Sequence, residues 1–410
     1  MTELAVNAAR LWQTITASAA IGPGRAGGLR RLALSDADRE MRDLFVAWCR
    51  DAGCTVTVDG VGNLFARRAG EDNSLPPVMV GSHLDTQIAG GKFDGVLGVL
   101  AGLEIVRTLN DRNMATRRPL EVVSWTNEEG VRFQPPMMGA AVFAGALERD
   151  WVLAQKDDDG MVFGEELRRI GYAGDAPPGG RAVDAYFELH IEQGPQLEAE
   201  GLQVGIVTGG FTTYGMHLNV HGENAHSGPT SMERRRNALV GAAMLIVGAN
   251  DIGWRHHPEG RASSSRVVVW PNKYGILPDF AELTCDIRHP QPARAAGMLA
   301  ELKQLIPQTE QRARVAVKVA REWTFGDVQF DAGCIGLVEA AARELQVPHK
   351  RMLSAAGHDA YHIAAIAPTA MIFTPCKDGV THNEAEHIEP DYTVPGVNVL
   401  LHAVLARANR

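Results

Sequence analysis

The chain has 410 residues, of which 45% are hydrophobic and 22% charged, a globular composition with enough material for two or three domains. Its net charge of −9 argues against a nucleic-acid partner, because phosphate binding needs a concentrated basic surface. The compact basic clusters are typical of solvated helix or loop faces; they are Arg30-Arg31, Arg117-Arg118 and Arg234-Arg235-Arg236.

The first part of the chain alternates helical and strand-like segments. A helix within the first ~35 residues leads into a Gly-rich turn at Ile21 to Gly24, and a second helix starts at the cap Ser35 and runs to Ala52. Strands follow, with a helix at Gly95 to Leu109 before the last of them; they are Cys54 to Val58, Leu64 to Arg67, Pro77 to Val80 and Leu120 to Trp125. Apolar strands alternating with helices predict an α/β fold around a central, mostly parallel sheet.

From Thr212 the pattern changes to the β-α-β-β-α-β order of a ferredoxin-like domain. The predicted elements are strand Tyr214 to His221, helix Met232 to Ala249, strands Arg266 to Trp270 and Phe280 to Arg288, helix Ala293 to Leu305 and strand Val315 to Trp323. Helical Cys334 to Leu345 and strand-like Thr369 to Thr374 then resume the first style. We therefore predict one α/β domain made of residues 1–211 and 330–410, with a smaller domain inserted at 212–329.

Cysteine usage and hydropathy indicate the compartment. The cysteines are odd in number and too scattered for a disulfide framework, so we interpret them as reduced thiols of a cytoplasmic protein. They are Cys49, Cys54, Cys285, Cys334 and Cys376. The longest nearly apolar stretch, Ala238 to Ala249, is too short to span a bilayer, and no membrane role is expected.

Histidine and acidic residues follow one predicted strand after another. His83, in Gly81-Ser82-His83-Leu84-Asp85-Thr86, comes at the end of an apolar strand, where open α/β sheets bind ligands. Asp85 is placed to receive the second ring N–H of His83, which would fix the tautomer that binds metal. Asp94 stands in a Gly-flanked turn before a helix, from which one carboxylate can bridge two metal ions.

Three later segments repeat this arrangement. They are Asn127-Glu128-Glu129-Gly130, His190-Ile191-Glu192-Gln193-Gly194 and Gly379-Val380-Thr381-His382-Asn383-Glu384. The adjacent side chains of Glu128 and Glu129 point in different directions, so one can bind metal while the other acts as a base. Each segment alone is also typical of a core histidine, a helix cap or a solvated loop. Together at strand ends they predict a metal site, whose ligand types suit Zn²⁺, with Mn²⁺ or Co²⁺ able to substitute.

These segments resemble the dizinc amidohydrolases of the N-carbamoyl-L-amino-acid hydrolase, β-ureidopropionase and allantoate amidohydrolase group, within the aminoacylase and carboxypeptidase G superfamily. The matching motifs run in order from Gly81 to His382 and include Ala-Gly-His-Asp-Ala at 356–360. Other members of the superfamily usually have an acidic ligand where His190 stands, so the resemblance favours the carbamoylase side.

The resemblance implies a ligand set for two Zn²⁺ per subunit. His83, Asp94 and His190 would hold one ion. Asp94, Glu129 and His382 would hold the other. Glu128 would be the general base and Asp85 would support His83.

The resemblance also implies substrate contacts and a homodimer built through the inserted domain, which would serve as a dimerisation and lid domain. His226 looks like the family histidine that reaches a partner subunit's active site, and Arg288 looks like the arginine that binds the substrate carboxylate. Gln193, Asn272 and Gly357 are further expected substrate contacts. From the residues alone, Arg288 is also typical of a surface ion pair, His226 of a turn and Gln193 of loop support.

Two departures from the family pattern fall in the inserted domain. The family's Ala-His-Ala-Gly-Thr-Thr-Pro-Met reads here Ala225-His226-Ser227-Gly228-Pro229-Thr230-Ser231-Met232. The second Asn of the family's Pro-Asn-x-x-Asn is Gly275 here, although Asn272 is present. Both departures concern substrate contacts and leave the metal ligands untouched.

We therefore expect an amidohydrolase that cleaves an N-carbamoyl amino acid to the amino acid, ammonia and carbon dioxide, with Glu128 taking the proton from a water that two zinc ions activate as hydroxide. Its partner is a small ureido or amide substrate with a carboxylate. The alternatives are an allantoate amidohydrolase, a metallo-aminopeptidase or aminoacylase, and a non-catalytic binding relative. Relatives of the last kind typically lose ligands or the base, all of which are present here.

Overall fold

The structure, a computed structural model, describes residues 4–410, and its contacts divide the chain into two compact units. Unit 1 comprises the residues up to Thr208 together with Gln329–Met352 and His358–Arg410, and unit 2 comprises Gly209–Val328 and Leu353–Gly357. The inserted segment thus runs from 209 to 328, against 212 to 329 in the sequence interpretation. The return of 353–357 to unit 2 has no counterpart in the sequence pattern.

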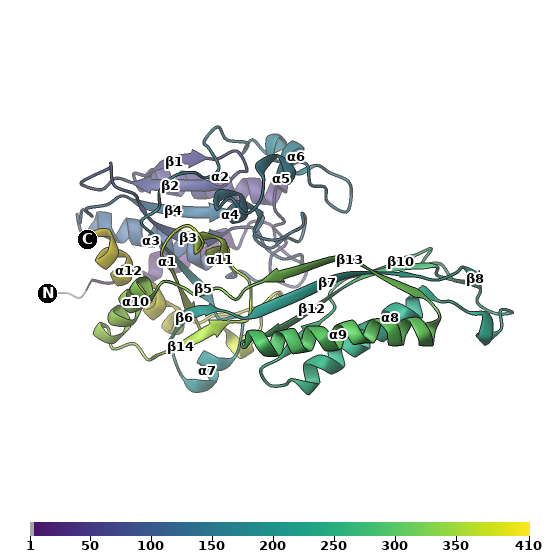
Figure 1. Cartoon of the computed structure of the whole chain (residues 1–410). Helices are drawn as coiled ribbons and strands as arrows, with labels where there is room; N and C mark the ends of the chain where they lie inside the picture. Colours follow the sequence, from purple (N-terminus) through teal and green to yellow (C-terminus); the bar gives the residue numbers. More distant parts are fainter. Residues whose placement is uncertain (1–3) are drawn as a thin grey trace. The chain divides into compact units, whose positions relative to one another are not determined.

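Unit 1 is built on an eight-stranded sheet with helices packed around it (Figure 1). The strands are β1 Thr55–Val58, β2 Leu64–Arg68, β3 Val78–His83, β4 Leu120–Trp125, β5 Ala185–Ile191, β6 Val204–Gly210, β14 His349–Ser354 and β15 Thr369–Thr374. The helices are α1 Ala8–Ser18, α2 Asp36–Asp51, α3 Val96–Asp111, α4 Met138–Phe143, α5 Arg149–Leu153, α6 Phe163–Arg169, α7 Gln196–Glu200, α10 Ala332–Glu344, α11 Asp359–Ile363, the 3-10 turn η2 Lys377–Gly379 and α12 Pro390–Ala408.

The sheet is mixed, with strand order β1-β2-β4-β3-β5-β15-β6-β14. Its centre, β4-β3-β5-β15, is parallel, whereas the pairs β1–β2, β2–β4 and β15–β6 are antiparallel. The prediction of a mostly parallel sheet was therefore wrong for the outer strands. The short connection from Val58 to Leu64 can only form a hairpin, because a parallel pair needs a crossover of a dozen or more residues.

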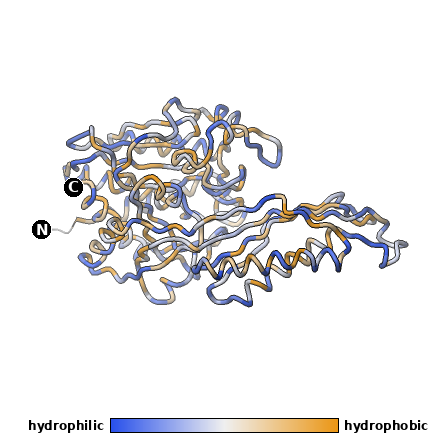
Figure 2. The backbone as a smooth tube through the Cα atoms, viewed as in Figure 1, coloured by the Kyte–Doolittle hydropathy of each residue, from blue (hydrophilic) through white to orange (hydrophobic). Residues whose placement is uncertain are grey.

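The central strands are apolar because both of their faces are covered. Every residue of β3, β4, β5 and β15 is buried, and Figure 2 shows hydrophobic segments running through the interior of this unit. Helix α3, which follows β3, is buried over nearly all of its length. At the start of α2 the predicted cap is present, since the Asp38 N–H donates to Ser35 Oγ at 3.2 Å.

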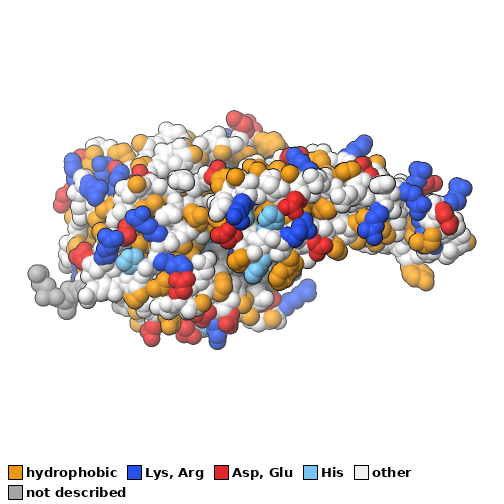
Figure 3. All heavy atoms as spheres, turned by 60° about the horizontal axis from the view of Figure 1, so that its bottom comes forward, with side chains coloured by type: hydrophobic (Ala, Val, Ile, Leu, Met, Phe, Trp, Pro, Cys, Tyr) orange, Lys and Arg blue, Asp and Glu red, His pale blue; other side chains and the backbone are white. Residues whose placement is uncertain are grey.

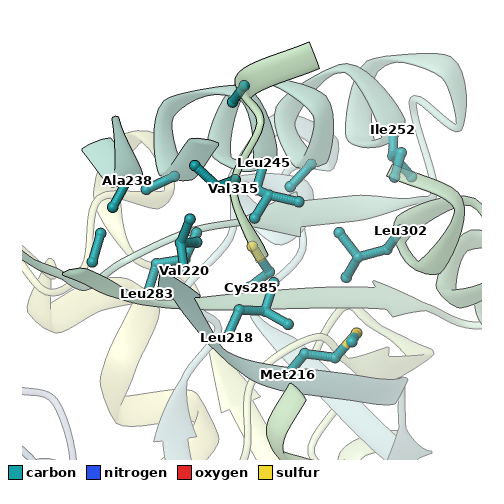
Figure 4. Packing of buried hydrophobic residues seen from close by; sticks show 14 of the residues in the cluster. Met216, Leu218, Val220, Ala238, Leu245, Ile252, Leu283, Cys285, Leu302 and Val315 are labelled. Carbon is teal, nitrogen blue, oxygen red and sulfur yellow. The ribbon is translucent and has the colours of Figure 1, made fainter. Parts of the chain in front are cut away.

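Unit 2 is an antiparallel sheet in the order β10-β12-β7-β13, with α8 and α9 packed on one face. Its elements are β7 Thr212–His221, β8 Ala225–His226, η1 Met232–Arg234, α8 Ala238–Arg255, β9 Arg261–Ser263, β10 Val267–Trp270, β11 Ile276–Leu277, β12 Phe280–His289, α9 Pro292–Ala313 and β13 Ala316–Phe325. The long elements follow the β-α-β-β-α-β order read from the sequence. Alternate residues of β7 and β12, among them Leu218 and Leu283, form the core with Leu245 and Leu302 of the helices (Figure 4).

One predicted helix begins later than expected. The segment predicted as helical from Met232 forms a single 3-10 turn and then an extended residue, Arg235, and α8 begins only at Ala238. Asn237 ends the interruption by capping α8, its Oδ1 accepting from the Leu239 N–H at 3.0 Å. A capping side chain competes with continuation of the helix and sets the new start.

The surface and the helices add two observations. Figure 3 shows charged side chains of both signs interspersed with hydrophobic ones on the face that it presents. Among the described residues, no helix combines the length and the apolar character needed to cross a bilayer.

Candidate metal centre

Two of the predicted ligands stand at the ends of neighbouring parallel strands. His83 is the last residue of β3 and His190 is the last but one of β5. Because Val80 pairs with Phe187 in the ladder, the two histidines occupy equivalent positions three residues further on. Their ring centroids are 6.0 Å apart, and both side chains are buried. The carboxyl edge of the sheet, where such sheets bind ligands, therefore presents two imidazoles side by side.

Both rings are held by main-chain carbonyls. Nδ1 of His83 lies 2.9 Å from the carbonyl oxygen of Asp85, and Nδ1 of His190 lies 2.9 Å from that of Ile191. Donation from Nδ1 leaves each Nε2 free to bind a cation. The Nε2 atoms lie 3.7 Å (His83) and 3.1 Å (His190) from Asp94 Oδ1.

A second group uses the other oxygen of the same carboxylate. Nε2 of His382 lies 3.4 Å from Asp94 Oδ2 and 3.3 Å from Glu129 Oε2. Gln87 Nε2 donates to Glu129 Oε2 at 2.7 Å, whereas Glu129 Oε1 is buried without a hydrogen-bond partner. In each group the potential ligand atoms lie within 4.8 Å of one another. Asp94 thus divides its two oxygens between the two groups.

The charges of this cluster fit divalent cations. Burial would raise the pKa of Asp94, but hydrogen bonds from His190 and His382 hold it well below its usual range. Against the effect of burial, the hydrogen bond to Asp94 raises the pKa of His190 and of His382 to about 9 each. Both shifts reflect the positive charge that the ionised carboxylate favours beside it. The His, Asp and Glu donors and the unpartnered Glu129 oxygen suit metal ions that would supply the same charge.

Glu128 is set apart from its neighbour Glu129. Its Oε2 lies 3.4 Å from Nε2 of His83, whereas Glu129 faces His382. Burial raises the pKa of Glu128 well above its usual value, and the carboxylates of Asp359 and Glu129 raise it further. The two adjacent acidic side chains therefore point to different groups, as the sequence analysis anticipates.

The contact expected between the carboxylate of Asp85 and His83 is not the one that forms. The carboxylate lies 3.9 Å from His83 Nδ1, and the carbonyl of Asp85 takes that position instead. Asp85 Oδ1 accepts from the N–H of Glu128 at 3.3 Å, and Oδ2 accepts from that of Glu129 at 3.2 Å. Asp85 therefore steadies His83 through its backbone and the Glu128-Glu129 segment through its side chain.

The turn that carries Asp94 depends on Gly95. This residue has φ of 67°, and a Cβ added to it would lie 2.2 Å from Nε2 of His83. A side chain here would be strained and would displace the imidazole. The Asp94 N–H donates to Glu386 Oε1 at 3.1 Å, which fixes the turn from the opposite side.

Two further polar groups around Asp94, Thr381 and Glu386, were not singled out from the sequence, whereas Gln193 was expected as a substrate contact. Thr381 Oγ1 donates to Asp94 Oδ2 at 3.0 Å and contacts Glu386 Oε2 at 3.2 Å. Gln193 Nε2 donates to the same Asp94 oxygen at 3.0 Å, and its Oε1 is buried without a partner. This hydrogen bond to Asp94 agrees with the alternative interpretation of Gln193, in which the residue supports its loop. The only sequence signal for Glu386 was the presence of two acidic residues, Glu384 and Glu386, shortly after His382.

A third set of potential ligands overlaps the first and consists of Glu188, His190 and His358. Both oxygens of Glu188 already accept hydrogen bonds, Oε1 from Ser82 Oγ at 2.7 Å and Oε2 from Tyr186 OH at 3.0 Å. The ring nitrogen of His190 that is not bonded to the main chain, Nε2, faces Asp94 Oδ1 at 3.1 Å. We therefore assign His190 to the Asp94 group and treat Glu188 as part of the scaffold.

The predicted residues of unit 2 are spread along that unit. His226 is exposed on β8, with its Nδ1 accepting from the Gly228 N–H at 3.0 Å, and Asn272 is exposed on a loop. Arg288 lies near the other end of β12, where its guanidinium donates to Asp286 at 3.0 Å and to the Ala355 carbonyl at 2.9 Å.

Gly357 and Gly275, the other two positions discussed for substrate binding, also lie in unit 2. Gly357 is the last residue of the segment Leu353–Gly357, which belongs to unit 2. Gly275 has φ of 90°, and its carbonyl accepts from the Ser227 N–H at 3.0 Å. That backbone conformation favours glycine, so the residue found in place of the family's second Asn suits the local geometry.

Comparison with known proteins gives consistent matches over the whole chain. The profile of peptidase family M20/M25/M40 matches residues 79–406. The N-carbamoyl-L-amino-acid amidohydrolase of Rhizobium meliloti is 44% identical over 403 residues, which cover 98% of this chain and 97% of that protein. Among solved structures, an amidase of the hydantoinase/carbamoylase family from Burkholderia vietnamiensis has a TM-score of 0.96 at 46% identity, covering 100% of this chain and 99% of the other. The structure described as AtUAH in complex with glyoxylate has a TM-score of 0.92 at 29% identity, covering 99% and 98%.

Proposed function

The chain belongs to peptidase family M20/M25/M40, and from this premise we propose that it is a hydrolase of an N-carbamoyl amino acid. The reaction cleaves a carbon–nitrogen bond that is not a peptide bond and yields the amino acid, ammonia and carbon dioxide. A relative of nearly equal length at 44% identity carries this activity in its name. The observation that carries the proposal is the convergence of His83, His190, His382 and Glu129 on the single carboxylate of Asp94.

The family is metal-dependent, and the proposed cofactor is two Zn²⁺ per subunit, with Mn²⁺ or Co²⁺ able to substitute. His83, Asp94 and His190 would hold one ion. Asp94, Glu129 and His382 would hold the other. When bound, such ions supply Lewis acidity that acidifies a water molecule and polarises the carbonyl group under attack.

Glu128 is the proposed general base. Burial and the neighbouring carboxylates raise the pKa of Glu128, which favours transfer of a proton from the attacking water to its carboxylate. Glu128 would then donate this proton to the leaving nitrogen. Asp85 holds this segment through the N–H groups of Glu128 and Glu129. The base is therefore positioned by the same carboxylate that steadies the neighbouring ligand.

Substrate recognition is assigned to polar groups of both units. Arg288 would bind the substrate carboxylate with a planar fork that lysine cannot reproduce. Hydrogen bonds to Asp286 and Ala355 already orient its guanidinium. His226 would bind and stabilise the reacting group, with Gln193, Asn272 and Gly357 as further contacts.

We propose a homodimer because one copy of unit 2 cannot bring His226 and Arg288 to one small substrate. Residues Phe280 and Arg288 of β12 are about 27 Å apart at the rise of an extended strand, and β8 lies beyond the Phe280 end (Figure 1). Unit 2 would then supply the dimerisation surface and the lid. Exposed apolar side chains on this unit support that role; they are Val240, Val247 and Trp254 of α8 with Val267, Val268 and Trp270 of β10.

The five cysteines are free and buried, which supports a reducing, cytoplasmic compartment. An allantoate amidohydrolase and an aminoacylase or aminopeptidase are the rival activities. Ammonia release measured over N-carbamoyl-α-amino acids, N-carbamoyl-β-alanine, allantoate, N-acetyl amino acids and dipeptides separates them. Turnover confined to the last two substrate classes, or a chain that binds no metal, would overturn the proposal.

A further inference from the structure

The Gly-rich turn near the N-terminus forms a small hairpin whose backbone N–H groups surround a carboxylate. The Gly24 N–H donates to the Gly28 carbonyl at 2.8 Å and closes the hairpin. Inside it, the N–H groups of Arg25, Ala26 and Gly28 donate to Glu384 at 3.0, 2.5 and 3.0 Å. N–H groups of one turn that point at a common anion in this way form an anion-binding nest. Glu384 stands two residues after His382 and about 360 positions from the hairpin in sequence.

The hairpin is fastened to the stretch of chain between His83 and Asp94. Leu29 and Gly90 exchange two backbone hydrogen bonds, both of 2.9 Å. The Arg31 N–H donates to Thr86 Oγ1 at 2.8 Å and its carbonyl accepts from the Thr86 N–H at 2.9 Å, while its buried guanidinium donates to the Leu84 carbonyl at 2.8 Å. The hairpin is therefore a rigid extension of the segment that carries the first group of potential ligands.

The contact with Glu384 leaves little room for a side chain at Gly24 or Gly28. A Cβ on Gly24 would lie 2.4 Å from Glu384 Oε2, and one on Gly28 would lie 2.6 Å from the Cα of Glu384. The φ of Gly24 is not in the left-handed region, so the turn itself does not require glycine there. Glycine is favoured because the carboxylate of Glu384 approaches so closely. Both the glycines and the N–H groups are thus matched to Glu384.

We infer that Glu384 is a positioning residue for His382, an inference that rests on the proposed function. The nest ties the His382 loop to the segment between His83 and Asp94, and so sets the separation between His382 and Asp94. Of the residues proposed to hold metal, His382 is the one with a half-exposed side chain, at 48%, and it has a positive φ of 49°. Its loop therefore needs an external support more than the buried strand ends do. Glu386 provides one support through the Asp94 turn, and Glu384 provides the other.

The test measures metal affinity rather than activity. Metal-free wild type, Glu384→Gln and Gly24→Ala are titrated with Zn²⁺ by calorimetry and with Co²⁺ by its visible absorption, and His382→Ala serves as the reference for loss of the second group. Gly24→Ala tests the same contact from the other side, because the added methyl group meets only the flexible end of Glu384. Gly336→Ala in α10 is the matched control, since a Cβ there meets no atom within 4 Å.

We expect both variants to bind one ion as the wild type does and the second ion about tenfold or more weakly, the usual loss when a residue that orients a ligand is removed. Unfolding temperatures of the metal-free proteins should stay equal, and Gly336→Ala should bind both ions normally. Unchanged second-ion affinity in both variants overturns the inference, and so does equal weakening of both ions. A wild type that does not bind two ions instead overturns the proposed function itself.

Discussion

The two units hold their candidate residues in opposite ways. In unit 1, His83, Asp94 and His190 are buried, and each is fixed by main-chain or carboxylate partners within hydrogen-bond distance. In unit 2, His226 and Asn272 are exposed on short strands and loops. The difference teaches that contacts inside unit 1 hold its candidate residues in place, whereas His226 and Asn272 of unit 2 are left open to a further surface, as the proposed homodimer requires.

The largest effect on activity is expected from a substitution in the buried centre of unit 1, at the proposed general base. Glu128→Gln should lower kcat by about 10³-fold or more, because the amide cannot accept a proton, while two metal ions remain bound. Steady-state ammonia release and metal analysis measure both. Glu165→Gln on the exposed face of α6 is the control. A near-normal kcat would remove Glu128 from its role.

Mixing variants tests whether unit 2 acts across subunits. His226→Ala alone should lose about 10²-fold in kcat, as expected for one donor to a developing oxyanion. Equal amounts of His226→Ala and Glu128→Gln subunits, dissociated and reassembled, should recover about a quarter of wild-type activity, since half of the dimers are mixed and each has one complete site. No recovery after verified exchange would place the whole site in one chain.

Arg288→Lys sharpens the contrast by separating charge from geometry. The variant should reduce kcat/KM for an N-carbamoyl amino acid by about tenfold, because lysine keeps the charge but not the two-pronged hydrogen bonding. An uncharged N-carbamoyl amine, assayed in parallel, should change little. Equal losses on both substrates would assign Arg288 to the architecture of β12 instead.

Metal removal should destabilise unit 1 and leave unit 2 unaffected. At a metal concentration of 100 times Kd, each bound ion stabilises the native state by about 2.7 kcal/mol. We therefore expect chelation to lower Tm by several degrees, with faster hydrogen exchange in β3, β5 and the His382 loop. Faster exchange confined to unit 2 would contradict the assignment of the metal site.

The smallest effect concerns acid stability. Burial lowers the pKa of His362 in α11 to about 4, from 6.5 in the unfolded chain. Between these values the unfolded state binds more protons, so stability falls as pH falls, by roughly 2 kcal/mol at pH 5. His362→Gln should flatten that part of the stability curve in urea melts at pH 5 and 7, whereas His257→Gln at an exposed site of unit 2 should not. An unchanged slope in His362→Gln would refute the assignment.

The sequence predicted the residues that follow strands and missed those that act over long separations. His83 and His190 were found because a histidine after an apolar run must lie at a sheet edge. Glu386 was missed because its partner, the backbone of Asp94, lies 292 positions away and leaves no local pattern. Asp85 was identified, but its contact with His83 was predicted wrongly. Residue spacing does not tell whether the backbone carbonyl or the side-chain carboxylate of Asp85 reaches the imidazole of His83.

The turn chemistry of unit 2 shows the same limit. The helix was expected from Met232, but the side chain of Asn237 caps it five residues later, and the sequence interpretation did not use that cap. The two central strands of unit 2 were readable because β12, and β7 over most of its length, place a buried residue at every second position.

The shared carboxylate of Asp94 has a consequence for anyone who wishes to redesign this protein. Each of its oxygens belongs to a different group of potential ligands, so under the proposed two-ion site a substitution intended to retune one ion would also perturb the other. Selective adjustment would therefore start from residues that belong to one group alone, with Glu129 and His382 in one group and His83 and His190 in the other.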